Sequence, residues 1–99
     1  MAQFDVFRPR DGRELLLDCQ SNILDGLETR FVVPLLGSAD MPERIARLNP
    51  RFEIDGEEFF MATQGAATIP ARMIGTRVTS LIDDHHVIVG ALDMLISGF

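Results

Sequence analysis

Apolar and polar residues alternate in short runs along most of the chain, and this period of two is typical of half-buried β-strands. Four stretches show the pattern: 2–8, 13–20, 30–36 and 67–75. Pro34 removes a hydrogen-bond donor from the third stretch, which predicts an edge strand or a bulge there. Pro70 interrupts the fourth stretch, which we expect to close at Gly75.

The segment 51–63 has the clearest local signal in the chain. Asp55 and Gly56 stand between two apolar-rich runs, and this dipeptide favours a two-residue type I′ turn. We therefore predict a β-hairpin over 51–63. The preceding segment, 38–50, begins with helix-start residues and stops at a proline, which indicates one short helix or helical turn.

The last segment changes to the helical period. Ser80, followed three residues later by Asp83, forms a capping-box pattern, so we expect a helix from Ser80 to about Ile96 that stops near Gly98. The order of elements is strands first and helix last. This order predicts a mainly β fold, a small barrel-like antiparallel domain with a C-terminal helix packed on or beside it.

The predicted helix has more apolar surface than one packing face needs. One stripe at helical spacing contains Leu81, Ile88, Leu92 and Leu95. A second stripe contains Val87, Ala91, Met94 and Ser97. The first stripe suits the core, and the second predicts a partner, for which a second copy of the chain is the natural candidate. The alternative is a helix buried all round within the monomer.

A glycine in the middle of this helix is a further sign of a partner. Gly90 costs about 1 kcal/mol relative to alanine in a helix interior. A close helix–helix crossing at Gly90 explains why a glycine is tolerated there.

Composition limits the class of protein. The chain has 99 residues, of which 46% are hydrophobic, and this size predicts one domain over 1–99. Its net charge is −6 and all nine basic residues are arginine, which argues against direct nucleic-acid binding. The apolar runs are too short to span a membrane. Cys19 is predicted to be a core residue, and a single unpaired cysteine suits a cytoplasmic protein.

Few residues suggest catalysis or metal binding. The run from Asp83 to His86 contains metal-capable side chains, but adjacent helical residues point about 100° apart and do not converge on one ion. Glu57 and Glu58 fall on opposite faces of a strand and are expected to be solvated. We expect no metal, no cofactor and no enzymatic site. The apolar chain end, "LDMLISGF", is instead predicted to be a binding end.

Several stretches, in order, resemble the CcdB toxins of toxin–antitoxin operons: "FDVF", "LDCQSNILD", "RFVVPLLGSA", "ATIPARMIGTRVTSL" and the closing apolar helix. The resemblance runs from Gln3 to Phe99. It implies an SH3-like barrel with a small extra sheet and a terminal α-helix, working as a homodimer. It further implies a topoisomerase inhibitor, not an enzyme, that binds the A subunit of DNA gyrase and is neutralised by a cognate antitoxin.

The resemblance also assigns residues to the two partners. The implied gyrase contacts are Ile23, Leu24, Asp93, Ile96, Ser97, Gly98 and Phe99. Ser97 stands where the family has a tryptophan, and loss of a buried aromatic anchor typically costs about 2 kcal/mol or more of binding. The implied antitoxin contacts lie in the loop after the first strand, at Arg8, Arg10 and Arg13. Simple solubility of a turn is the alternative role for these arginines.

Two other functions remain open from the sequence. A toxin homologue that has lost gyrase activity would act as an antitoxin-binding or regulatory dimer, and Ser97 supports this alternative. An endoribonuclease toxin of the same fold is the other alternative. It depends on Arg30, Arg72 and Arg77, because such an enzyme needs a basic or acid–base cluster on a concave face.

Overall fold

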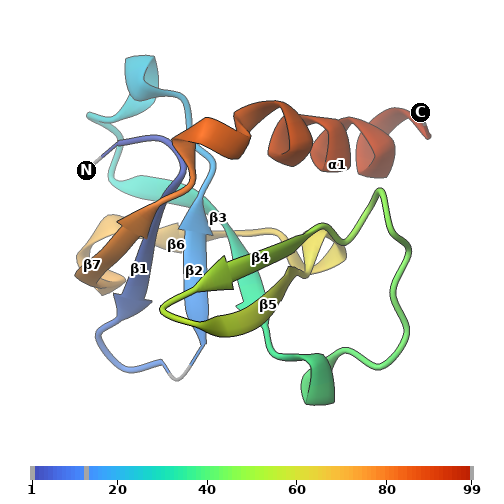
Figure 1. Cartoon of the computed structure of the whole chain (residues 1–99). Helices are drawn as coiled ribbons and strands as arrows, with labels where there is room; N and C mark the ends of the chain where they lie inside the picture. Colours follow the sequence, from blue (N-terminus) through green and yellow to red (C-terminus); the bar gives the residue numbers. More distant parts are fainter. Residues whose placement is uncertain (1, 13, 99) are drawn as a thin grey trace.

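In the part of the chain that the structure describes, seven antiparallel strands form one curled sheet, and a helix near the C-terminus crosses beside it (Figure 1). The computed structural model describes residues 2–12 and 14–98. The strands are β1 (Asp5–Pro9), β2 (Leu15–Asp18), β3 (Thr29–Leu36), β4 (Arg51–Ile54), β5 (Glu57–Met61), β6 (Ala67–Pro70) and β7 (Ile74–Ser80). The helix is α1 (His85–Ser97). The predicted class, an SH3-like barrel with a terminal helix, is confirmed.

The order of strands in the sheet is β4-β5-β3-β2-β1-β7, and β6 pairs with β3 off this path. β3 therefore has two neighbours on one side. Thr29 to Val32 pair with β6, whereas Leu35 and Leu36 pair with β5. Pro34 lies between these two regions, so the donor that it lacks falls where β3 changes neighbour. The prediction of an edge or bulge at Pro34 is wrong, because β3 is a central strand.

The predicted hairpin is confirmed. Ile54 pairs with Glu57, which leaves Asp55 and Gly56 as a two-residue loop between β4 and β5. Both loop residues have positive φ, 53° and 79°, as a type I′ turn requires. The local sequence alone is enough to specify this turn.

The segment 38–50 forms a helical turn and no longer helix. A 3-10 turn covers Ser38–Asp40, and the chain beyond it is irregular. Asn49 is buried and organises this irregular part. Its Oδ1 accepts from the amide of Ile45 at 3.1 Å and its Nδ2 donates to the carbonyl of Met61 at 2.9 Å. Side-chain hydrogen bonds therefore replace a helical ladder here.

Two predicted boundaries near the end of the chain are wrong. The strand expected over 67–75 is divided, because β6 ends at Pro70, a 3-10 turn covers Ala71–Met73, and β7 then continues through Gly75 to Ser80. Gly75 does not close the strand. A Cβ at Gly75 would lie 2.2 Å from the carbonyl oxygen of Arg8, so glycine permits the close approach of β7 to β1.

The terminal helix begins five residues later than its capping pattern predicts. Ser80 is the last residue of β7, and its Oγ accepts from the amide of Ile82 at 3.2 Å. A 3-10 turn, Ile82–Asp84, then leads into α1. Pairing of Ser80 with Asp5 extends the strand, and this long-range pairing overrides the local signal. The predicted end of the helix near Gly98 is confirmed.

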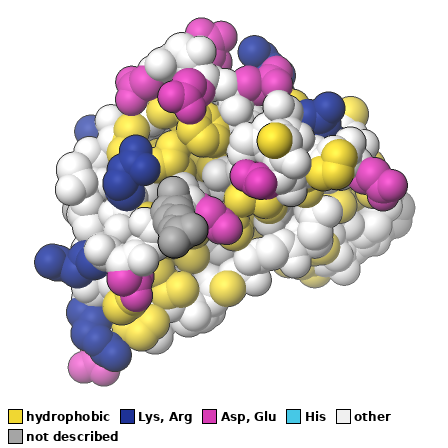
Figure 2. Space-filling model, turned by 90° about the horizontal axis from the view of Figure 1, so that it is seen from below, with side chains coloured by type: hydrophobic (Ala, Val, Ile, Leu, Met, Phe, Trp, Pro, Cys, Tyr) yellow, Lys and Arg dark blue, Asp and Glu magenta, His cyan; other side chains and the backbone are white. Residues whose placement is uncertain are grey.

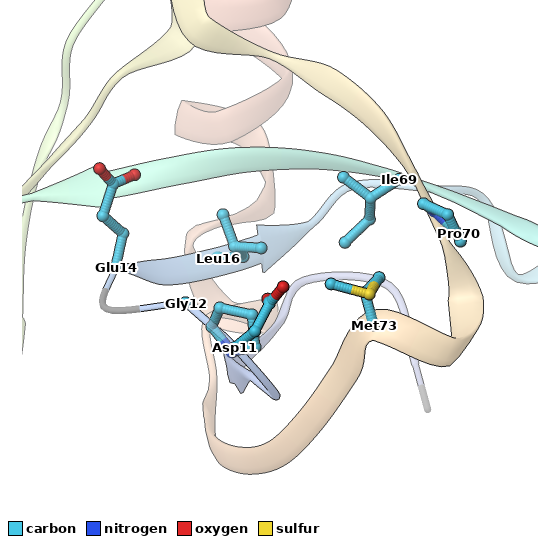
Figure 3. A pocket seen from close by; sticks show the side chains of 8 residues that line it. Asp11, Gly12, Glu14, Leu16, Ile69, Pro70 and Met73 are labelled. Atoms are coloured by element: carbon cyan, nitrogen blue, oxygen red, sulfur yellow. The ribbon is translucent and has the colours of Figure 1, made fainter.

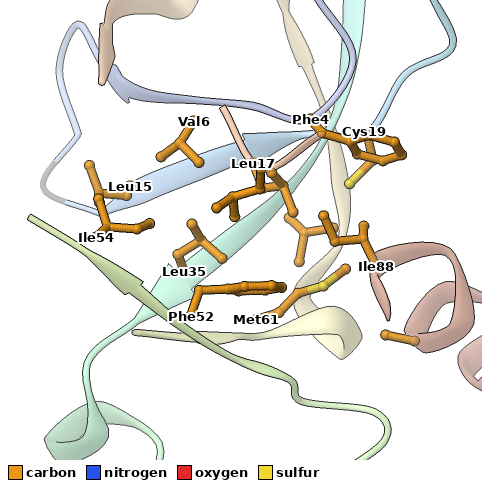
Figure 4. Close-up of a cluster of buried hydrophobic side chains, with 13 residues drawn as sticks. Phe4, Val6, Leu15, Leu17, Cys19, Leu35, Phe52, Ile54, Met61 and Ile88 are labelled. Atoms are coloured by element: carbon orange, nitrogen blue, oxygen red, sulfur yellow. The ribbon is translucent and has the colours of Figure 1, made fainter. Parts of the chain in front are cut away.

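The core lies between the concave side of the sheet and α1 (Figure 4). Ile88 and Ala91 are the helix residues that are fully buried in it. Ala91 therefore belongs to the core and not to the second stripe, whereas Leu95, assigned to the core stripe, is exposed. Cys19 is buried as predicted, and burial, followed by the nearby Asp18 carboxylate, raises the pKa of its thiol to about 12.

Candidate partner-binding surfaces

The C-terminal end of α1 is exposed and ends in a defined turn. Gly98 has φ of 81°, and its amide donates to the carbonyl of Met94 at 2.9 Å. This is the left-handed helix stop that glycine favours. Ile96, with 81% of its surface exposed, and Asp93 both face solvent near this end. Phe99 lies outside the described residues.

The side chain of Ser97 is bonded back onto the backbone of α1. Its hydroxyl donates to the carbonyl of Asp93 at 2.7 Å. The hydroxyl therefore forms a bond to the carbonyl four residues earlier in α1, and the side chain presents no large apolar group to a partner. Among the described residues of the tail, Ile96 is the most exposed large apolar side chain, and Leu95 beside it is 43% exposed.

A second exposed aliphatic group lies on a short 3-10 helix, η1 (Asn22–Leu24), and the turn after it. Ile23 is 91% exposed and Leu24 is also exposed. The structure adds Leu27, which is 51% exposed and was not identified from the sequence. An apolar residue in the polar stretch "DGLET" was the available signal.

Within one chain these two exposed groups are separated by the length of α1. The amide of Gln3 donates to Asn22 Oδ1 at 2.8 Å, and the carbonyl of Phe4 accepts from the amide of Leu81 at 2.8 Å. These bonds tie η1 to the segment that leads into α1, whereas Ile96 lies at the opposite end (Figure 1). A helix of 13 residues is about 20 Å long. One chain therefore does not bring the two groups together.

The exposed side of α1 contains apolar as well as polar residues. Val87 and Val89 are exposed there, which contradicts a helix buried all round within the monomer. A Cβ added at Gly90 would meet nothing within 4 Å. Nothing in the described chain accounts for a glycine at this position.

Comparison with known families identifies the family of this chain. The family model described as CcdB protein matches residues 3–98. The chain belongs to the CcdB family. Membership in this family supports a toxin of a toxin–antitoxin pair.

In this CcdB-family chain, Arg8 and Arg10 line a surface hollow with Gly75 and Thr76, and Pro9 between them also lines a separate apolar groove. Arg8 and Arg10 are exposed, and Arg10 Nε donates to the carbonyl of Ile74 at 3.1 Å. Arg13 lies outside the described residues. The groove has a volume of about 490 Å³ and is lined by Pro9, Asp11, Gly12, Glu14, Leu16, Ile69, Pro70 and Met73 (Figure 3).

Acidic, basic and apolar side chains are interspersed on the face that contains the β1–β2 loop (Figure 2).

The endoribonuclease alternative requires arginines at the surface. Arg30, however, is 3% exposed and pairs with Asp18, so it does not reach an RNA strand. Arg77 pairs with Asp5 at 3.3 Å. The structure therefore gives the CcdB-family chain no converging cluster at Arg30, Arg72 and Arg77.

The other candidates for chemistry have structural roles. His85 Nδ1 lies 3.1 Å from the carbonyl of Ile82, and its ring meets that of His86 edge to face, with centroids 5.6 Å apart. Glu58 forms an ion pair with Arg51 on the hairpin. Across residues 2–12 and 14–98, no three His, Cys, Asp or Glu side chains gather as a metal site needs. Within the same ranges no helix is long and apolar enough to cross a membrane.

Proposed function

We propose that this CcdB-family chain is a dimeric cytoplasmic toxin that binds the A subunit of DNA gyrase and inhibits it without itself being an enzyme. One observation carries the proposal. The exposed aliphatic side chains lie where the family places its gyrase contacts, with Ile23 and Leu24 on η1 and Ile96 at the end of α1. Exposed aliphatic groups of this kind mark interaction surfaces.

The homodimer forms through the outer surface of α1. Val87 and Val89 supply apolar area, and the open space at Gly90 allows a partner helix to approach closely. A two-fold axis repeats both exposed groups on the second chain, so the dimer presents two copies of η1 and two helix ends.

The tail of this toxin lacks the aromatic anchor of its family. Ser97 bonds to its own helix, so the free energy of gyrase binding comes from Ile96, Gly98 and Phe99 together with η1. Loss of about 2 kcal/mol corresponds to a roughly thirtyfold weaker complex. The same observation favours the alternative, a homologue that has lost gyrase activity and acts as an antitoxin-binding or regulatory dimer.

Titration calorimetry against a gyrase A-subunit fragment separates these two functions. Three proteins are compared: wild type, Ser97→Trp, and a chain that ends at Ser97. Binding by wild type but not by the shortened chain supports the toxin, with Phe99 as the anchor. Binding by Ser97→Trp alone supports the alternative, a homologue that has lost gyrase activity. Binding by none of the three proteins contradicts gyrase as the target.

The cognate antitoxin contacts Arg8, Arg10 and Arg13 at the loop between β1 and β2. A disordered acidic or amphipathic tail folds along this surface on binding. Replacing Arg8 by glutamate should weaken the antitoxin complex. Arg47→Glu, at an exposed position on the loop before β4, is the matched control. Equal antitoxin affinities for the two variants would contradict the assignment.

A further inference from the structure

A buried ion pair lies directly behind η1. Arg30 Nη2 donates to Asp18 Oδ2 at 2.5 Å, and the two side chains are 3% and 0% exposed. Burying two charges carries a large desolvation cost, and apolar replacements of such pairs are often equally stable. Arg30 Nε is buried and has no hydrogen-bond partner among the described residues, which adds to that cost. Stability alone therefore does not explain the pair.

The ion pair belongs to a network that reaches the backbone of η1 from inside. Gln20 Nε2 donates to the carbonyl of Leu24 at 2.7 Å, and Arg30 Nη1 lies 3.5 Å from the carbonyl of Asp25. Gln20 is itself fixed at two points. Its backbone amide donates to Asp18 Oδ1 at 3.1 Å, and its side-chain Oε1 accepts from the backbone amide of Phe31 at 2.9 Å. Two consecutive carbonyls of η1 and its turn are thus held by buried side chains.

η1 has little else to hold its shape. Every residue from 22 to 29 is exposed, so core packing does not fix this segment. Its internal bonds are those of a single short turn, such as Leu24 N to Ser21 O at 2.9 Å. The other side-chain bonds to this segment are those from the amide of Ile23 to Ser21 Oγ at 3.3 Å and from the amide of Gln3 to Asn22 Oδ1. The geometry of the exposed aliphatic side chains therefore depends on the buried network.

We infer that Asp18, Gln20 and Arg30 are positioning residues that hold Ile23, Leu24 and Leu27 in a fixed arrangement for the gyrase A subunit. The inference rests on the proposed function. A preordered segment loses less conformational entropy on binding than a mobile one, so the network increases affinity without touching the partner. It also adds Leu27 to the surface that contacts gyrase.

Gln20→Leu tests the inference with two readouts, because it removes the side-chain bonds to Leu24 and Phe31 while leaving the ion pair in place. The first readout is hydrogen exchange at the amides of Leu24 and Leu27, which does not depend on gyrase. We expect exchange there to become at least about tenfold faster, with the amides of β2 and β3 still protected except that of Phe31, which loses its acceptor on Gln20. The second readout is calorimetry with the gyrase fragment, where affinity should fall about tenfold.

A double-mutant cycle separates positioning from a general loss of stability. Once η1 is mobile, Ile23 contributes less to binding, so Gln20→Leu and Ile23→Ala should together cost less than the sum of their separate effects. Additive effects would overturn the inference. Arg51→Gln is the matched control, because it removes an exposed ion pair on the hairpin and should change neither readout.

Gln20→Glu keeps an acceptor for Phe31 and loses the donor to Leu24, and it replaces Gln20→Leu if the leucine variant fails to fold. Unchanged hydrogen exchange in η1 overturns the inference whatever the affinity for the gyrase fragment. Faster exchange with unchanged affinity overturns it as well, because order in η1 is then irrelevant to binding. Absence of gyrase binding by wild type contradicts the proposed function and, with it, the assignment of gyrase as the partner of η1.

Discussion

The carbonyl oxygen of Phe4 accepts a hydrogen bond from the amide of Leu81 at 2.8 Å, and this bond ties the start of β1 to the segment that leads into α1. Phe4 has φ of 70°, a conformation that a bulky residue rarely adopts. Its ring is buried in the core beside Cys19 (Figure 4). Packing of this ring therefore maintains a backbone geometry that joins the two ends of the fold.

A glycine usually destabilises a protein more than an alanine at the same position, and at Phe4 we expect this order of stabilities to be reversed. Phe4→Ala should lower the free energy of unfolding by about 3–5 kcal/mol, because it leaves a cavity in the core. Phe4→Gly should be no less stable than Phe4→Ala, because glycine has no steric penalty at positive φ. Urea unfolding measures both values. Phe59→Ala, at a half-buried position, should cost less than Phe4→Ala, and equal losses would contradict the role of Phe4.

Gly98 should be required for its backbone conformation and not for space. A Cβ there meets nothing within 4 Å, but φ is 81°. Gly98→Ala should cost about 1 kcal/mol, which lowers the melting temperature by about 5 °C in a chain of this size. Gly98→Asn should lower the melting temperature less than Gly98→Ala does, because asparagine tolerates the left-handed region. Equal melting temperatures for alanine and asparagine would contradict the αL requirement.

Gly90 should lie at the dimer interface. Gly90→Arg adds a long charged side chain to open space, so the fold of each chain should persist while the proposed dimer dissociates. Sedimentation at micromolar concentration should then give half the mass of wild type. Gly37→Arg also enters open space, away from α1, and should leave the mass unchanged. A wild-type protein that sediments as a monomer would contradict the dimer directly.

Ile23→Asp should abolish gyrase binding and leave stability within about 0.5 kcal/mol, since exposed positions contribute little to folding. Ile45→Asp is the control, because Ile45 is similarly aliphatic and 55% exposed but lies on the loop before β4. Calorimetry with the gyrase fragment and thermal unfolding measure the two effects. Equal losses of affinity at both positions would point to non-specific hydrophobic binding.

Cys19 should make the protein less stable at high pH. The folded chain holds the thiol proton up to about pH 12, whereas an exposed thiol releases it near about pH 8.5. The unfolded chain is therefore the first to lose its proton as pH rises. The free energy of unfolding should be unaffected below about pH 8.5 and then fall by at most about 1.4 kcal/mol per pH unit up to about pH 12.

This range contains few competing groups, because the chain has no lysine and no tyrosine. Cys19→Ala should remove the decline in stability while lowering stability at neutral pH through a smaller side chain. Chemical unfolding at several pH values, at one protein concentration, measures both. A decline that persists in Cys19→Ala would assign it to another group.

The buried network behind η1 shows where a sequence pattern stops being informative. Asp18, Gln20 and Arg30 look like ordinary strand-end polar residues, and Arg30 was a candidate RNA contact. Their pairing depends on β2 lying against β3, with Asp18 opposite Val32. Leu27 had a weak signal, because one apolar residue in a polar turn is common. Its exposure depends on where η1 lies relative to the rest of the domain.

Features whose causes lie within a few residues could be predicted from the sequence. The turn at Asp55 and Gly56 and the helix stop at Gly98 follow from local backbone preferences. Three other features could not be predicted from local sequence: the start of α1, the passage of β7 through Gly75 and the burial of Ala91. Each of these depends on contacts between segments far apart in the chain, and the energy of those contacts exceeds the local preferences that the sequence displays.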